Sequence, residues 1–321
     1  MRNFAPACLA LLLLIACTSE RSPSQPPPTP SASPRTLEVA GAIVFAGDDG
    51  EIHLLELPSG ADARVTSERG DRLDPDAHGR LVVFRDVRDG VNINDEIYAV
   101  GANGDELVNL TNSPDSNEWG PALSPDGERI AFNSDRGGEP QVYVMNADGT
   151  GVELLADRWG EYPAWSPDGG RIAFESYVGG TTPFGDPDYD LFVMNADGSD
   201  VTNLTDDPTS KDDYPTWSPD GRWIAFDSTR GTPDDFEPPL NDPERTSDSD
   251  IWVMRPDGSE LRNVTADLET VDEFPDWSEH GIVYTREGAI VVVSPDGSAE
   301  LDVSELTGVF GVFPAWVGRG A

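Results

Sequence analysis

One stretch of about a dozen residues recurs along this chain, and this repetition limits the possible folds more than any other feature. "PALSPDGERIAF" begins at Pro121, "PAWSPDGGRIAF" at Pro163 and "PTWSPDGRWIAF" at Pro215. Looser copies extend the series, and its leading proline stands at six places: Pro75, Pro121, Pro163, Pro215, Pro275 and Pro314. A unit that returns at such intervals predicts an array of similar supersecondary structures, each packed on the next.

Each unit contains more than this stretch. A second apolar motif follows, for example "QVYVM" at 141–145 and "DIWVM" at 250–254, and then a third, for example "NLT" at 109–111. "SPDG" and "NADG" separate these segments and supply the Asp-Gly pairs that tight hairpins require. Four short antiparallel strands per repeat are typical of a β-propeller blade, so the sequence predicts an all-β fold.

The ends of the repetitive region determine the number of blades. Residues 41–66 contain the second, third and fourth strands of a unit without its first strand, whereas "FGVFPAWV" at 310–317 is a first strand with nothing after it. Together these fragments complete one blade, which closes the ring and removes exposed sheet edges. We therefore predict a six-bladed β-propeller over residues 40–317, followed by a tail at 318–321.

The N-terminal residues indicate export rather than globular structure. Residues 1–16 contain one arginine and then an apolar run that is short for a membrane span, as in a signal peptide. The run ends in "LIAC" at Cys17, which resembles the bacterial lipobox and implies a lipidated cysteine; an ordinary secretory signal is the alternative. Residues 17–39 are rich in proline and serine and are predicted to form a tether. We expect a membrane-anchored lipoprotein outside the cytoplasm, either at the outer membrane and periplasm or on the outer cell surface.

The charge of the chain restricts its partners. The formal net charge is −39, from 60 acidic and 21 basic residues. Such a surface repels nucleic acid and anionic headgroups, so we expect no nucleic-acid binding and membrane contact only through a lipid anchor. Cations and basic peptides are compatible partners, and a solvated acidic surface, adapted to a saline habitat, is the alternative interpretation. We expect a monomer.

The repeat also carries a family resemblance. "WSPDGxxIAF" followed by "xIYVMNADG…LT" resembles the propeller repeat of the TolB-like family, and related repeats occur in the propellers of prolyl peptidases. The resemblance covers nearly all of residues 41–317 and implies the fold, together with a role in binding or scaffolding an envelope protein or peptide. It does not include the α/β domain that precedes the propeller in TolB.

Carboxylates gather on the longer connections. Glu161, Asp213 and Glu273 stand two residues before the proline of their units, and Glu118 stands three before Pro121. In a propeller this position lies near the mouth of the central channel, so we predict a partial carboxylate ring there that attracts a cation or a basic peptide.

Two units carry insertions between their second and third strands, at 177–190 and 228–250. They contain alternating aspartates at Asp186, Asp188, Asp190, Asp248 and Asp250. Aspartates in flexible loops are calcium ligands, so these residues are a candidate calcium site, although they do not match an EF-hand loop. Asp190 and Asp250 also stand at a repeated strand start, which favours a structural role for those two. We expect no other cofactor.

Signatures of catalysis are scarce. The chain has no G-x-S-x-G elbow, no H-E-x-x-H, and neither of the common glycine-rich nucleotide loops. Its three histidines, His53, His78 and His280, occupy blade positions that do not converge. We therefore predict a binding or scaffold module without catalytic residues. The alternative is a propeller enzyme of the glycosidase or lyase type that uses loop carboxylates on a carbohydrate.

Overall fold

The computed structural model describes residues 37, 39–67, 70–87, 94–182, 187–232, 248–266 and 270–318. All of them belong to one compact unit, Pro34–Ala321. The predicted signal peptide, Cys17, nearly all of the predicted tether and Asp186 lie outside the described residues. Within the described part of the chain, no helix combines the length and the apolarity needed to cross a bilayer.

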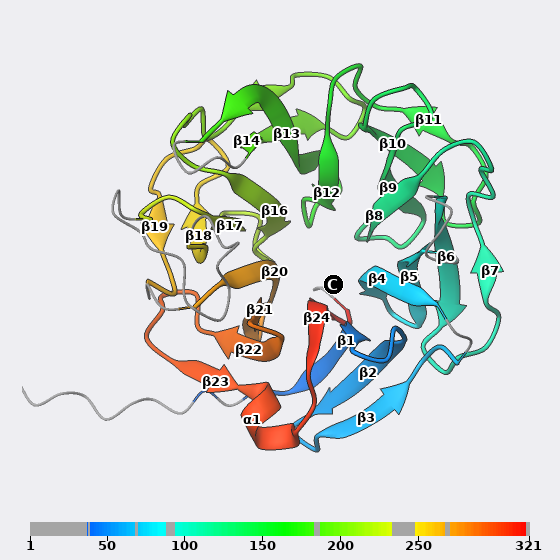
Figure 1. The fold of residues 1–321 in the computed structure, drawn as a ribbon, viewed down its shortest axis with the longest axis vertical. Coiled ribbons are helices and arrows are strands. Elements are labelled where there is room, and N and C mark those ends of the chain that lie inside the picture. Colours follow the sequence, from blue (N-terminus) through cyan, green and yellow to red (C-terminus); the bar gives the residue numbers. More distant parts are fainter. Residues whose placement is uncertain are drawn as a thin grey trace, which may run out of the picture. The chain divides into compact units, whose positions relative to one another are not determined.

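Six four-stranded antiparallel sheets surround a central channel (Figure 1). Each sheet is one blade, and in Figure 1 the inner strands β4, β8, β12, β16, β20 and β24 ring the centre. The first blade in chain order comprises β4 (Asp71–His78), β5 (Leu81–Val87), β6 (Asp95–Gly101) and β7 (Val108–Asn109). The second comprises β8 (Glu118–Leu123), β9 (Arg129–Ser134), β10 (Gln141–Asn146) and β11 (Glu153–Leu154). The third comprises β12 (Glu161–Trp165), β13 (Arg171–Thr181), β14 (Pro187–Asn195) and β15 (Thr202–Asn203). The fourth comprises β16 (Asp212–Trp217), β17 (Ile224–Ser228), β18 (Asp250–Met254) and β19 (Arg262–Asn263). The fifth comprises β20 (Asp272–Ser278), β21 (Gly281–Arg286), β22 (Ala289–Val293) and β23 (Glu300–Asp302). The sixth comprises β24 (Gly311–Trp316), β1 (Gly41–Gly47), β2 (Ile52–Leu57) and β3 (Ala61–Arg64).

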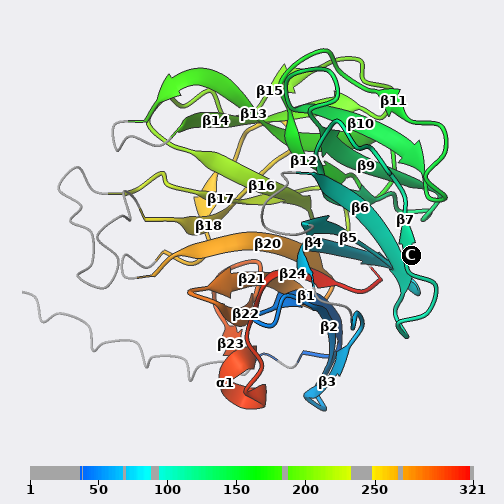
Figure 2. The ribbon, with the colours of Figure 1, turned by 45° about the vertical axis from the view of Figure 1, so that its right-hand side comes forward.

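The last of these blades joins the two ends of the ring, as the sequence predicts. β24 pairs antiparallel with β1, with Trp316 opposite Ile43, and the two strands lie side by side in both Figure 1 and Figure 2. The backbone N–H of Val317 donates to the carbonyl of Ala42 at 2.8 Å. The prediction of an all-β, six-bladed propeller closed by its C-terminal strand is confirmed.

The repeated "SPDG" segments are tight turns between the first and second strands. In Ser124–Gly127, Ser166–Gly169 and Ser218–Gly221 the glycine N–H donates to the serine carbonyl at 2.8 Å. These glycines have φ of 67–70°, which an L side chain rarely adopts. The turns between third and fourth strands, such as 146–149, lie at the same end of the blades, and we call this end the short-turn face. The connections into the inner strands form the opposite end, the long-loop face.

The second strand of each blade supplies the core. Its apolar triplet ends in an aromatic residue that is at most 1% exposed, at Phe45, Phe84, Phe132, Phe174, Phe226 and Tyr284. Burying such a side chain stabilises the fold by about 1.5–3 kcal/mol. A single helix among the described residues, α1 (Val303–Thr307), follows β23; Asp302 caps it by accepting from the N–H of Glu305 at 2.7 Å.

The tryptophans of the repeat join neighbouring blades. The indole N–H of Trp165 donates to the carbonyl of Ala122 in the preceding blade at 3.2 Å, and Trp217 makes the same bond to Ala164 at 3.1 Å. Trp165 is 5% exposed, and the guanidinium of Arg129 lies 4.5 Å from its ring centroid. These tryptophans therefore pack between blades, as their position in the repeat indicates.

Candidate functional site

The six inner strands share a backbone irregularity just before their prolines. The preceding residue has φ between 45° and 58° in every blade, and the register of the strand pair shifts at this point: Asp74, Gly120, Tyr162, Tyr214, Phe274 and Phe313. We call this set the channel throat. A non-glycine residue in this conformation is strained by about 1–3 kcal/mol, and such strain persists only where surrounding contacts hold it.

Polar side chains of the preceding blade hold three of these residues. The backbone N–H of Tyr162 donates to Asn133 Oδ1 at 3.0 Å, that of Tyr214 to Glu175 Oε2 at 2.9 Å, and that of Phe274 to Asp227 Oδ2 at 3.1 Å. The acceptors stand at the same place in their second strands, directly after the "IAF" triplet. Each bond fixes a bulge and ties one blade to the next.

Four aromatic rings meet in the throat. Ring centroids are 4.3 Å apart for Tyr162 and Tyr214, 4.6 Å for Tyr214 and Phe274, and 4.0 Å for Phe274 and Phe313. These residues, with Asp74 and Gly120, line a cavity of about 110 Å³. The aromatic series occupies four consecutive blades, and the other two blades contribute a carboxylate and a glycine.

Asp74 is the acidic member of the throat. Its side chain is nearly inaccessible, and the residue is 8% exposed. Its Oδ2 accepts weakly from the N–H of Gly120 at 3.4 Å and lies 3.7 Å from Arg85 Nη1, whereas its Oδ1 has no hydrogen-bond partner among the described residues. Burial raises the pKa of Asp74 to about 6, although Arg85 opposes the shift.

Three of the four predicted ring carboxylates occupy one register position, above the throat. Glu161 pairs with Glu175 across its strand pair, Asp213 with Asp227, and Glu273 with Thr285. Lys211, the one lysine of the chain, interacts with Glu161, Glu175, Asp213 and Asp227, and Glu273 interacts with Asp227. We call the five carboxylates the acidic mouth: Glu161, Glu175, Asp213, Asp227 and Glu273.

The charges of the acidic mouth interact strongly. Lys211 Nζ forms an ion pair with Asp213, whose side chain is 6% exposed, while the lysine side chain is 33% exposed. Burial disfavours the charge of Lys211, but Asp213 and Glu175 outweigh this and raise its pKa. Burial raises the pKa values of Glu175 and Asp227 well above the usual range, and the negative charge of Asp213 raises them further.

Glu161 is held differently from its neighbours. The indole N–H groups of Trp159 and Trp119 donate to its two carboxylate oxygens at 2.8 Å and 3.2 Å. Burial raises its pKa, although both indoles oppose the shift. One donor comes from β8 of the preceding blade and the other from the connection into β12, and together they fix this carboxylate at the edge of the channel.

Glu118 does not belong to this ring, although it was predicted as a member. It pairs with Ser134, one register position away from the place that Trp119 occupies, and is therefore equivalent to Asp212 and Asp272. Glu118 is fully buried and accepts from Ser116, Ser134 and Arg136. Glu118, Asp212 and Asp272 thus form a second set of acidic residues, which stabilises the blades from within.

Two of the aspartates predicted to bind calcium have clear structural partners. Asp190 accepts from the side chains of Asn203 at 2.7 Å and Thr205 at 3.1 Å, and Asp250 accepts from Asn263 and Thr265 at the same distances. The repeated "N-x-T" motif therefore ties a fourth strand to the start of the third. Asp188 and Asp248 are buried nearby. No three His, Cys, Asp or Glu side chains among the described residues are arranged to hold a metal ion, and calcium binding stays a prediction.

The sequence indicated part of this site and missed the rest. Glu161, Asp213 and Glu273 follow from their place before the proline. Glu175 and Asp227 were missed, although "IAFES" and "IAFDS" place an acidic residue at equal positions in neighbouring blades. The sequence shows that Lys211 is the one lysine of the chain, but not that it lies among these carboxylates. Asp74 was missed because its equivalents are aromatic residues and glycine.

The fold and site define a class of protein: a closed six-bladed propeller with an acidic channel entrance and an aromatic throat. Residues 20–176 match the family model described as TolB beta propeller domain. An uncharacterized protein of Agrobacterium fabrum is 33% identical over 154 residues, which are 46% of this chain and 51% of that protein. A TolB homolog of Chlorobium luteolum is 31% identical over 49% of this chain and 34% of its own length.

Solved structures agree on the fold. TolB from Acinetobacter baumannii superimposes with a TM-score of 0.65 at 19% identity, over 89% of this chain and 68% of that chain. A TolB structure from Agrobacterium tumefaciens superimposes with a TM-score of 0.61 at 21% identity, over 83% of this chain and 88% of that chain. This chain aligns with between a third and about half of the length of the curated relatives. The chain thus resembles TolB β-propeller proteins, in sequence over residues 20–176 and in fold over most of its length.

Proposed function

We propose that this protein is an extracytoplasmic binding module that receives a cationic segment of an envelope protein in its acidic mouth. The observation that carries the proposal is the grouping of five carboxylates around the single lysine of the chain at the long-loop end of the channel. Clefts lined by one sign of charge concentrate the opposite sign. The TolB-like repeat supports a role in binding, because propellers present loops on a rigid scaffold.

The same carboxylates do not favour the glycosidase alternative. Hydrolysis requires two carboxyl groups that flank a bound sugar, with one protonated and one ionised. Here Glu161 accepts from two indoles, while Glu175 and Asp227 accept backbone N–H groups of the next blade. These bonds hold the three carboxylates in structural contacts rather than free to flank a bound sugar.

The test compares two variants with the same change of net charge. Glu161→Gln, Asp213→Asn and Glu273→Gln combined should weaken binding of a fluorescent Lys-Gly repeat peptide at least tenfold in an anisotropy titration. Glu106→Gln, Glu128→Gln and Glu260→Gln combined alter exposed carboxylates near the short turns and serve as the matched control. Equal affinities of the two triple variants would show that only overall charge attracts the peptide.

We also propose that lipid at Cys17 anchors the protein. The lipobox resemblance at Cys17 and the proline-rich tether support this. Cys17→Ala should move the protein from the membrane fraction to the soluble fraction and abolish metabolic palmitate labelling. Cys8→Ala, within the predicted signal peptide, is the control and should remain labelled. Membrane association of the Cys17 variant at the wild-type level would contradict the proposal.

A further inference from the structure

The channel throat combines two features that recognise a particular chemical group. Its cavity of about 110 Å³ is bounded by the half-buried rings of Tyr162, Tyr214, Phe274 and Phe313. Aromatic faces carry partial negative charge and attract cations, most strongly where water is excluded. Aromatic surfaces alone would also accept any small apolar group, so the charge in the cavity decides between ligands.

Asp74 supplies that charge. Its Oδ1 has no hydrogen-bond partner in the part of the chain that the structure describes, which is costly for a group that is 8% exposed. The neighbouring cation Arg85 lies 2.5 Å from Asp95 Oδ2 through one terminal nitrogen and 3.7 Å from Asp74 Oδ2 through the other. With Asp74 ionised, these three groups carry one negative charge in excess.

We propose that the channel throat is a binding pocket for an alkylammonium group, which contacts Asp74 with its charge and the four aromatic rings with its methyl or methylene groups. A divalent metal ion does not suit this pocket, because such ions require several oxygen ligands. The other two carboxylates that line the cavity, Asp76 and Asp276, accept the backbone N–H groups of Leu123 and Trp316, and no three acidic or histidine side chains among the described residues are arranged to hold a metal ion. An anion is excluded by the Asp74 carboxylate. The group arrives either on a free amine or on a lysine side chain of a peptide. The proposal goes beyond the acidic mouth and does not depend on a protein partner.

Calorimetric titration with tetramethylammonium chloride tests the pocket directly. We expect saturable binding, against none for sodium chloride at equal ionic strength or for tert-butanol, which is similar in shape but uncharged. Nα-acetyl-lysine methylamide forms the second arm. Binding of tetramethylammonium alone indicates a free amine, and binding of the lysine derivative indicates a peptide side chain. Absence of both would overturn the proposal.

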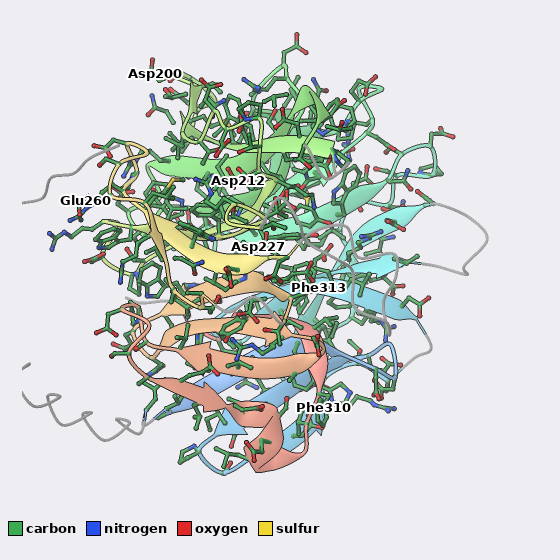
Figure 3. All side chains as sticks on the ribbon, turned by 60° about the vertical axis from the view of Figure 1, so that its left-hand side comes forward. Asp200, Asp212, Asp227, Glu260, Phe310 and Phe313 are labelled. Carbon is green, nitrogen blue, oxygen red and sulfur yellow. The ribbon has the colours of Figure 1, made fainter. Side chains whose placement is uncertain are left out.

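Substitutions locate the ligand within the channel. Asp74→Asn should weaken binding at least tenfold, whereas Asp126→Asn, an exposed carboxylate on a short turn, should not. Phe313→Ala should weaken binding similarly, and the control is Phe310→Ala. Phe310 is 56% exposed and lies beside α1, away from Phe313 (Figure 3). Phe313→Leu keeps apolar volume without an aromatic face and replaces the alanine variant if that one does not fold.

The pH dependence gives an independent measurement. Since the pKa of Asp74 is about 6, affinity should fall about tenfold from pH 7.5 to pH 5 as this carboxylate is protonated. The charged and titratable groups near it are Arg85, Asp95, Tyr162 and Tyr214, with Glu175 beyond the tyrosines. Asp76 and Asp276 line the same cavity. Burial raises the pKa of both tyrosines, so they stay neutral in this range. The dependence should vanish in Asp74→Asn; if it persists unchanged there, Asp74 is not the group that binds the cation.

The mouth variant separates this proposal from the proposed function. Glu161→Gln, Asp213→Asn and Glu273→Gln combined should keep tetramethylammonium affinity within about threefold, because the throat residues are intact. Loss of ammonium binding in that variant, with normal binding in Asp74→Asn, would place the cation in the acidic mouth and refute the throat pocket. Failure of the Lys-Gly peptide to bind would contradict the proposed function of the acidic mouth, whereas the ammonium titration would still test the throat.

Discussion

Deletion of residues 310–321 should destabilise the propeller by more than about 5 kcal/mol, which is comparable with the whole stability of a typical domain. The deletion removes β24, including Trp316, which is 1% exposed, and Ala315, which is 4% exposed. It also leaves β1 without its inner neighbour, so a strand edge faces the channel. We expect a protein that is unfolded or aggregated at 37 °C, measured by circular dichroism and size-exclusion chromatography.

Two further variants test whether this result is specific to ring closure. Deletion of residues 319–321 alone leaves β24 in place and should preserve the melting temperature. Trp316→Ala keeps the strand but removes its largest buried side chain, and should cost about 3–5 kcal/mol. A deletion from Phe310 that melts at the wild-type temperature would show that the ring does not depend on this strand.

Replacing Lys211 with methionine should destabilise the fold by about 2–3 kcal/mol at pH 8. Removing one partner of a fully buried ion pair costs about 3–5 kcal/mol, and the expectation is lower because the lysine side chain is 33% exposed. Arg64→Met is the matched control: Arg64 is 50% exposed and pairs with Asp49 at the surface, so its loss should cost less than about 1 kcal/mol. Urea unfolding of both variants measures the difference.

The cost of Lys211→Met should depend on pH. Glu175 and Asp227 have folded-state pKa values raised above those of the unfolded chain, so the native state binds more protons and stability falls as pH rises above about 4. Lys211 offsets part of this loss by favouring the ionised forms. Without it the fall should be steeper, and the difference between variant and wild type should shrink toward pH 4. A difference that is constant from pH 4 to pH 8 would contradict this account.

Much of the fold could be predicted because each blade is encoded by a similar sequence motif. The triplet before Asn133, the "SPDG" turn at Ser124 and the strand after it recur with the same local physics, so one unit explains the next. The closing blade was predictable because its two halves are each incomplete. The acidic position before the proline was visible for the same reason, at Glu161, Asp213 and Glu273.

The throat could not be predicted, because it depends on register between blades rather than on any one repeat. Glu118 shows the difficulty: one residue of shift moves a carboxylate from the channel edge to a buried bond with Arg136. Asp74 shows it again, since its significance comes from the aromatic residues of other blades. Only the positive φ at six equivalent positions explains how these side chains come to share one cavity.

The meeting of β24 and β1 has a topological consequence. Trp316 lies opposite Ile43 just as Trp165 lies opposite Ile172, so the polypeptide is interrupted where another blade has its Ser-Pro-Asp-Gly turn. The ring therefore has no obligatory starting point, and circular permutants that join residue 317 to residue 41 through a short linker and open at another of these turns keep every strand pairing. Both ends of the ring emerge at the short-turn face, so fusion partners attached there leave the opposite entrance of the channel unobstructed.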